Sequence, residues 1–282
     1  MSSTGGSANG QDPFSYLTST WSEELELLDG FSSAFGIPSM VELAKEVQSL
    51  PPKKRFTNTE TVVEEVFGVG DVDEPGLQDL PENVVDSLPN ESKLNAMMPS
   101  FLLFLRNKVQ ETENAVIDRA VSDREHERSY LVLFAFLREL SSRLGELYHA
   151  ANSDEPEDKD QLLSETLALN SWLILAAAGE VEQFDERILR DIFYARYYET
   201  KRHGCDPKFD PAELSFGEMR RKLVIDAVVA IYDRRDISVS RGAELAAVSI
   251  EQFERILEAA GISPNYGPES GAELNDGPTL SK

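Results

Sequence analysis

The clearest pattern of hydrophobic and polar positions lies in the middle of the chain, over residues 93–209. Apolar side chains recur there at every third or fourth position, which is the period of an α-helix with one buried face. The pattern predicts four long helices, over residues 99–122, 123–151, 161–178 and 181–201. Because their connections are short, we expect the helices to pack as a bundle. The expected core positions are Leu102, Leu105, Val109, Val116, Ala120, Leu131, Phe134, Leu137, Leu140, Leu144, Leu147, Ile188, Ile192, Ala195 and Tyr198.

A weaker helical pattern precedes the bundle, over residues 14–67. Its best signal is Ser39 followed three residues later by Glu42, the arrangement of a capping box that starts a helix. The next residues, 68–92, are rich in glycine, proline and acidic side chains, and they predict an acidic linker.

The C-terminal part has the layout of a helix-turn-helix unit. A helix over residues 223–232 is followed by Ser240, which we expect to cap a short second helix. Ser249, with Gln252 three residues later, forms a second capping box and starts a third helix. The small Ala243 marks the place where we expect two of these helices to approach closely. Such a unit reads DNA with the N-terminal residues of the helix that follows the turn.

These patterns predict an all-α protein, with a helical N-terminal and middle region followed by a small helix-turn-helix domain. The expected order is a disordered tail (1–13), short helices (14–67), an acidic linker (68–92), a helical bundle (93–209), the helix-turn-helix domain (210–263) and a loose tail (264–282).

The residues from 223 to 273 resemble the small prokaryotic family UPF0175. The resemblance rests on an aliphatic helix ending in Ile231-Tyr232, then Ile237-Ser238, and on the segments SRGAELAAVS (240–249), FERIL (253–257) and GISPNY (261–266). It implies an antitoxin-like protein with a helix-turn-helix. The chain departs from the family at Gly242, where a lysine is expected. The resemblance covers about 50 of the 282 residues, so it implies nothing about the acidic helical region.

The charge of the chain is unevenly distributed. The 282 residues carry 51 acidic and 27 basic side chains, for a formal net charge of −24. Residues 1–216 hold 40 acidic and 19 basic side chains, whereas residues 217–263 hold eight acidic and seven basic ones. The whole protein is therefore not a basic nucleic-acid coat, and a polyanion is repelled least at the C-terminal unit.

The acidic excess also bears on the solvent that the protein tolerates. Arginine outnumbers lysine by 17 to 10, and this acidic, lysine-poor composition resembles that of soluble proteins from extreme halophiles, where salt screens self-repulsion. The alternative is a low-pI mesophilic protein with acidic tails.

The sequence offers no constellation for catalysis. Cys205 is the single cysteine, so an internal disulfide framework and a multi-cysteine zinc site are excluded. Glu146 with His149, and Asp123 with His126, have metal-ligand spacing, but the two pairs lie along one expected helix about 34 Å apart and cannot share an ion. A phosphate-binding loop and a serine nucleophile elbow are also missing. We therefore expect a protein that is not an enzyme, with no catalytic residue, cofactor or metal.

An aromatic stretch on the fourth helix of the bundle allows two interpretations. Its members are Phe193, Tyr194, Tyr197 and Tyr198. Such side chains stack nucleobases in some proteins. They also fill bundle cores and subunit contacts, which is the use that we favour here.

The sequence indicates a cytoplasmic protein without a membrane segment. The first twelve residues lack the basic and apolar parts of a signal peptide. The longest apolar run, residues 130–137, is far shorter than the ~20 residues that a membrane helix needs.

Two functions of different classes remain. The first is DNA binding in transcriptional regulation, by a homodimer held together by the bundle. Its expected contact residues are Ser240, Arg241, Ser249, Gln252, Arg255, Arg220, Arg221, Arg234 and Arg235. The second is a protein-interaction module, in which the bundle binds a toxin or regulator and the C-terminal unit only packs or docks.

Overall fold

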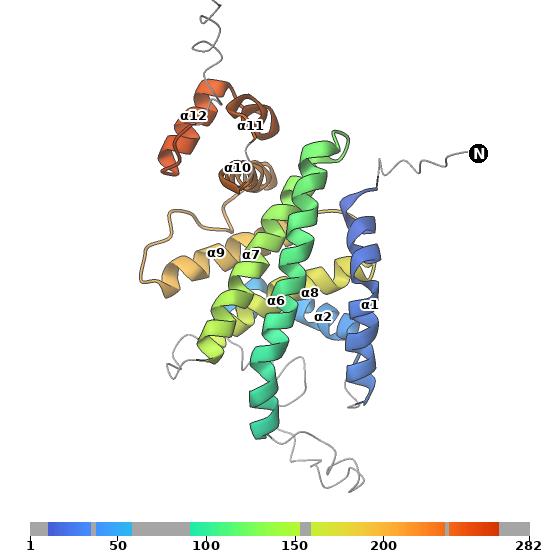
Figure 1. The fold of residues 1–282 in the computed structure, drawn as a ribbon. Coiled ribbons are helices and arrows are strands. Elements are labelled where there is room, and N and C mark those ends of the chain that lie inside the picture. The colour runs from blue at the N-terminus through green and yellow to red at the C-terminus, as the bar shows by residue number, and fades with distance from the viewer. Residues whose placement is uncertain (1–10, 35–37, 58–90, 153–158, 235–236, 265–282) are drawn as a thin grey trace, which may run out of the picture. The chain divides into compact units, whose positions relative to one another are not determined.

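The computed structural model describes residues 11–34, 38–57, 91–152, 159–234 and 237–264. These residues form ten helices and no strand, which confirms the predicted all-α class (Figure 1). None of the described helices has both the length and the apolarity that a bilayer crossing needs. The chain divides into two compact units, Met1–Arg220 and Arg221–Lys282.

Three helices precede the middle region: α1 (Pro13–Ala34), α2 (Met40–Ser49) and α3 (Pro52–Thr57). Helix α1 begins after Asp12, whose carboxylate accepts hydrogen bonds from the backbone N–H groups of Phe14 and Ser15. The capping box predicted at Ser39 and Glu42 is present at the start of α2, with both reciprocal hydrogen bonds 3.2 Å long. The predicted acidic linker lies almost entirely outside the described residues.

The middle region consists of α6 (Glu91–Ser122), α7 (Glu127–Ala151), α8 (Lys159–Ala177) and α9 (Glu186–Arg202). Helices α6 and α7 pack side by side over much of their length (Figure 1). Every core position predicted from the periodicity is buried, apart from the half-buried Tyr198. The period of the apolar residues therefore identified the buried faces correctly.

The expected starts of three of these helices were wrong. Helix α6 begins eight residues before Pro99, which lies inside it although proline lacks the backbone donor of a helix interior. Helix α7 begins at Glu127, because Asp123 folds the chain into a turn by accepting from the N–H groups of Glu125 and His126. Helix α9 begins only after Asp185, whose carboxylate accepts from the first turn.

Helix α8 is the centre of the first unit, since it packs against α1, α2, α3, α7 and α9. All seven residues from 171 to 177 are buried, so the C-terminal part of this helix is covered on every side. A helix of that kind is stable only inside a protein, where neighbours cover its whole surface. The other helices of the unit supply that cover.

The second unit contains most of α10 (Phe216–Arg234), with α11 (Val239–Ala246) and α12 (Ile250–Ala259). Helix α10 begins seven residues before the expected position. Its Tyr232 contacts the fully buried Phe253 of α12 edge to face, with ring centres 5.8 Å apart. The N-cap of α11 is Ser238 and not Ser240, because the Ser238 hydroxyl accepts from the N–H of Arg241 while Ser240 lies inside the helix.

Candidate functional site

The connection between α11 and α12 consists of Ala247, Val248 and Ser249. Ala247 has a φ of 52°, in the left-handed region, and its N–H donates to the carbonyl of Glu244. The N–H of Val248 reaches back to the carbonyl of Ala243 at 3.0 Å. These bonds use the free carbonyls at the end of α11 and turn the chain into α12 within three residues.

The start of α12 is fixed by the capping box that the sequence predicts. The Ser249 hydroxyl accepts from the N–H of Gln252, and the Gln252 side-chain oxygen accepts from the N–H of Ser249, both at 3.2 Å. Both residues are exposed. The cap uses the side-chain oxygen of Gln252. The amide N–H₂ group of Gln252 is therefore the part of this side chain that can donate to a ligand.

Gly242 and Phe253 mark the closest approach between α11 and α12. A Cβ atom on Gly242 would lie 2.3 Å from Cε1 of Phe253. Ala243 itself is buried, and the expectation that it marks a close approach of two helices stays a prediction. A lysine at position 242, which the family resemblance implied, would displace the buried Phe253 ring. Packing in this chain therefore opposes any side chain at position 242.

The basic side chains predicted to bind DNA differ in exposure. Arg220, Arg221 and Arg234 are exposed on α10. Arg255 is 73% exposed on α12, and its guanidinium lies 3.1 Å from Glu251. Arg241 is only 19% exposed and pairs with Glu244 at 2.8 Å. The exposed Ser240 lies on the same helix as Arg241, and Arg235 is outside the described residues.

The solvent-facing side of α12 also carries acidic groups that the structure adds to the site. Glu251 and Glu258 are exposed and Glu254 is half-buried, against the single cation Arg255 on this helix. A carboxylate near DNA accepts from the amino group of cytosine and repels phosphates. Helix α12 therefore offers hydrogen-bonding groups for base edges and little attraction for the backbone.

The first unit contains a buried ionic network that the sequence pattern did not reveal. Arg143 on α7 is fully buried, and its guanidinium lies within 3.0 Å of four carboxylates from three helices. These carboxylates belong to Glu139 and Glu146 on α7, Glu165 on α8 and Glu199 on α9. Arg202 binds both Glu146 and Glu165, and Arg196 binds Glu139. The network therefore joins the three helices at one end of the bundle.

Burial and pairing act against each other within this network. Burial alone would lower the pKa of Arg143, but the surrounding carboxylates, Glu139 first, raise it above its usual range. For the fully buried Glu165, burial dominates and raises the pKa. For Glu199, which is partly exposed, burial is outweighed by the hydrogen bond from Arg143, and the pKa is lowered. All of these groups are paired with one another, so the loss of any one of them would leave a charge without its partner inside the bundle.

A second buried ion pair lies between α3 and α9. Arg55 donates two hydrogen bonds to Asp191, at 2.8 and 3.0 Å, and the indole N–H of Trp172 donates to the same carboxylate. Beside it, Phe56 stacks on Tyr194 and Tyr198 of the aromatic stretch. The aromatic stretch therefore packs against α3 within the first unit.

One group in the described residues has the composition of a metal site. Ligand atoms of Glu146, Glu199 and His203 lie within 4.8 Å of one another. Both glutamates are already bound by Arg143, and Glu146 also by Arg202. Two guanidinium groups beside the same carboxylates oppose a further cation, so we assign no metal here.

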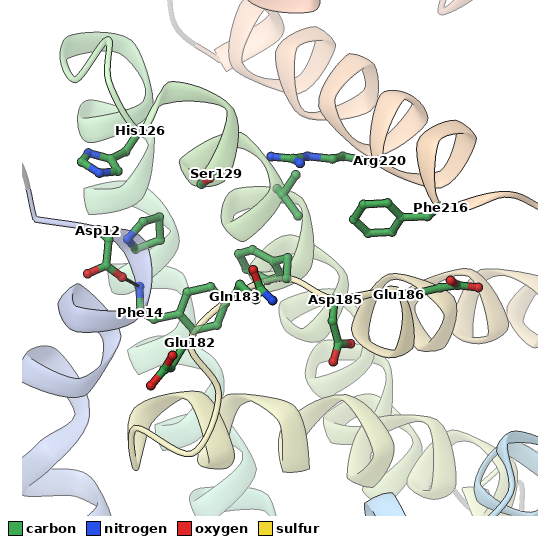
Figure 2. A pocket seen from close by; sticks show the side chains of 13 residues that line it. Asp12, Phe14, His126, Ser129, Glu182, Gln183, Asp185, Glu186, Phe216 and Arg220 are labelled. Carbon is green, nitrogen blue, oxygen red and sulfur yellow. Dashed lines mark hydrogen bonds between the residues drawn. The ribbon is translucent and has the colours of Figure 1, made fainter.

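A cavity of about 560 Å³ lies in the first unit, between the start of α1, the start of α7 and the segment before α9 (Figure 2). Asp12 and His126 form one wall and Asp185 lies across from them, with Phe216 and Arg220 at the start of α10 completing the lining. The two aspartates serve as the N-caps of α1 and α9. These two carboxylates of the cavity lining are thus engaged in holding helix ends.

Comparison with known proteins gives one finding, for the C-terminal region. Neither the curated proteins nor the solved structures contain a match to this chain. The residue pattern resembles UPF0175 from residue 223 onward, and the match to that family's model extends further toward the N-terminus. Residues 210–273 match the family model described as "Uncharacterised protein family (UPF0175)", as the sequence resemblance predicted.

Proposed function

We propose that this protein is an antitoxin-like transcriptional regulator that binds duplex DNA through α11 and α12. The observation that carries the proposal is the exposed start of α12, which a three-residue connection and a capping box hold at a fixed angle to α11. DNA-reading units need one helix that braces and a second whose N-terminal residues face the major groove. The match of residues 210–273 to UPF0175 supports the family of this region and carries no role of its own.

Each polar residue has a defined part in this proposal. Ser249, Gln252 and Arg255 face the groove, while Ser240 and Arg241 lie on the bracing helix and contact phosphates. Arg220, Arg221, Arg234 and Arg235 supply flanking phosphate contacts. The pair of Arg255 with Glu251 is exposed on both sides, so it is worth about 0–1 kcal/mol and a phosphate or guanine can replace the glutamate.

The proposal includes two copies of the chain on the DNA, because units of this kind bind two half-sites about one helical turn apart. It also places the protein in the cytoplasm, where it reaches chromosomal DNA. Repulsion from the acidic first unit opposes binding, so we expect an affinity optimum at intermediate salt.

The experiment measures binding of the full-length protein to its own upstream DNA over a salt series. Arg255→Glu and Arg241→Glu are the test variants. Arg187→Glu is the matched control, because Arg187 is also 73% exposed and paired with a neighbouring carboxylate, but lies in the first unit. We expect both test variants to weaken sequence-selective binding by about tenfold or more, and the control to leave it unchanged.

The absence of selective binding, or binding indifferent to both reversals, refutes this function. A second candidate, a protein-interaction module, is favoured by the three glutamates of α12, which weaken attraction to phosphates. A protein that copurifies in fixed stoichiometry with a chain that has no DNA affinity supports this second function.

A further inference from the structure

Helices α1 and α6 of the first unit carry large apolar side chains that face solvent. Leu27 on α1 is 70% exposed, and Phe104 and Phe101 on α6 are 52% and 44% exposed. Scattered exposed apolar residues are ordinary, whereas a group on one surface marks an interaction site. We call these three residues the α1–α6 apolar patch.

Two contacts between α1 and α6 fix the direction in which the two helices run past each other. The indole N–H of Trp21 donates to the hydroxyl of Thr112, and Glu24 binds Lys108 at 2.5 Å. The two helices are therefore antiparallel, because positions rise along α1 as they fall along α6 (Figure 1).

The patch lies about one to two helical turns beyond the contact between Glu24 and Lys108. Phe104 and Phe101 lie four and seven residues before Lys108, which places them on the stripe of α6 that meets α1. Leu27 lies three residues after Glu24, on the side of α1 that Glu24 turns toward α6. Beyond the two contacts between the helices, the same stripes therefore carry exposed apolar side chains.

The rim of the patch is acidic. Glu23, four residues before Leu27, and Glu111, seven residues after Phe104, are both exposed on the same stripes. The one cation between them, Lys108, is already paired with Glu24. An occupant therefore meets an apolar centre with negative charge beside it.

Charge separates the candidate occupants. Residues 58–90 of this chain contain nine acidic side chains and no lysine or arginine, so they are repelled by the rim. A second copy would bring the same patch with the same glutamates, and a symmetric contact would place like charges together. A basic amphipathic helix complements both the apolar centre and the acidic rim.

We propose that the α1–α6 apolar patch binds a basic amphipathic helix of another protein. The apolar face of that helix covers Leu27, Phe101 and Phe104, and its lysine or arginine side chains face Glu23 and Glu111. This inference goes beyond DNA binding by the C-terminal unit and does not depend on it, since every residue involved belongs to the first unit.

The test uses the full-length protein and a synthetic helical peptide of about 18 residues, with leucine at positions i, i+3, i+4 and i+7 and lysine elsewhere. A peptide with the same leucines and glutamate in place of lysine is its counterpart. Fluorescence anisotropy measures the binding of each. We expect the lysine peptide to bind at least about tenfold more tightly than the glutamate peptide.

Variants locate the binding on the patch. We expect Phe101→Ser with Phe104→Ser to weaken the lysine peptide about tenfold or more, and Leu27→Ser, on the other helix, to weaken it as well. Ile250→Ser is the matched control, since Ile250 is 48% exposed in the second unit. Circular dichroism verifies folding, and Leu27→Ser keeps the test decisive if the double variant does not fold.

Three results overturn the proposal. The first is equal binding of the lysine peptide by wild type and the folded patch variants, which is attraction to net charge alone. The second is tighter binding of the glutamate peptide. The third is a wild-type dimer in solution that the patch variants convert to a monomer, which assigns the patch to a second copy. DNA binding is measured in a separate experiment, so a failure to bind DNA does not affect the interpretation of these three results.

Discussion

The position of a Cβ atom on Gly242 lies 2.3 Å from Cε1 of Phe253, well inside the contact distance of two carbon atoms. The ring of Phe253 is fully buried and is held against Tyr232, so it has little room to withdraw. The angle between α11 and α12 therefore depends on a glycine at this one position.

We predict that Gly242→Ala destabilises the second unit. Alanine would normally favour a helix by about 1 kcal/mol over glycine, but the overlap with Phe253 costs about 1–3 kcal/mol. The net effect should be faster hydrogen exchange in peptides from residues 239–259, read by mass spectrometry. Gly217→Ala in α10 is the control, because a Cβ there meets nothing within 4 Å. Equal exchange in wild type and Gly242→Ala would contradict the close approach.

Ala247 provides a prediction of the opposite sign. Its φ of 52° is strained for any residue with a side chain, whereas glycine adopts it freely. We expect Ala247→Gly to stabilise the connection by about 0.5–1 kcal/mol, which slows exchange in α11 and α12 about two- to fivefold. Ala246→Gly, inside α11, should speed exchange instead, because glycine weakens a helix interior. Faster exchange in Ala247→Gly would refute the left-handed conformation.

The buried network predicts a large loss of stability on removing its central cation. Arg143→Met leaves four carboxylates without their shared partner, so we expect the free energy of unfolding to fall by about 3–5 kcal/mol. Arg187→Met removes an exposed pair and should cost less than about 1 kcal/mol. Both tryptophans, Trp21 and Trp172, lie in the first unit, so urea titration followed by tryptophan fluorescence reports the unit directly. A loss below about 1 kcal/mol for Arg143→Met would show that the network is not formed.

Glu199 gives a prediction about acid. Its folded-state pKa is lowered by Arg143, so the unfolded chain takes up the proton first as the pH falls. The stability that Glu199 contributes is fully present above its unfolded pKa of about 4.3 and is lost as the pH falls through the lower folded value. Glu199→Gln should therefore be less stable than wild type at pH 7, with a smaller loss between about pH 5 and 3. Parallel stability curves for the two proteins would contradict this assignment.

The repeating apolar positions predicted the all-α class and the buried faces of the bundle, because helical periodicity is a local property of the chain. Both capping boxes, at Ser39 and Ser249, were predicted for the same reason. The starts of α6, α7 and α9 were not. The position of Pro99 predicted the first turn of α6, but Pro99 lies inside the helix, and an aspartate is compatible with several positions near a helix end. The DNA-binding role, the partner and the dimer remain predictions.

The sequence by itself predicted most of the helices, the apolar faces of the bundle helices, and the family resemblance of the C-terminal region. Only the tertiary structure decided that Arg143 and Glu165 are buried together, although each is charged and therefore predicted to face solvent. It also decided that Gly242 meets Phe253, and that Phe101 and Phe104 are left exposed. Burial and ion pairing depend on which helices meet, and the periodicity of a single helix does not contain that information.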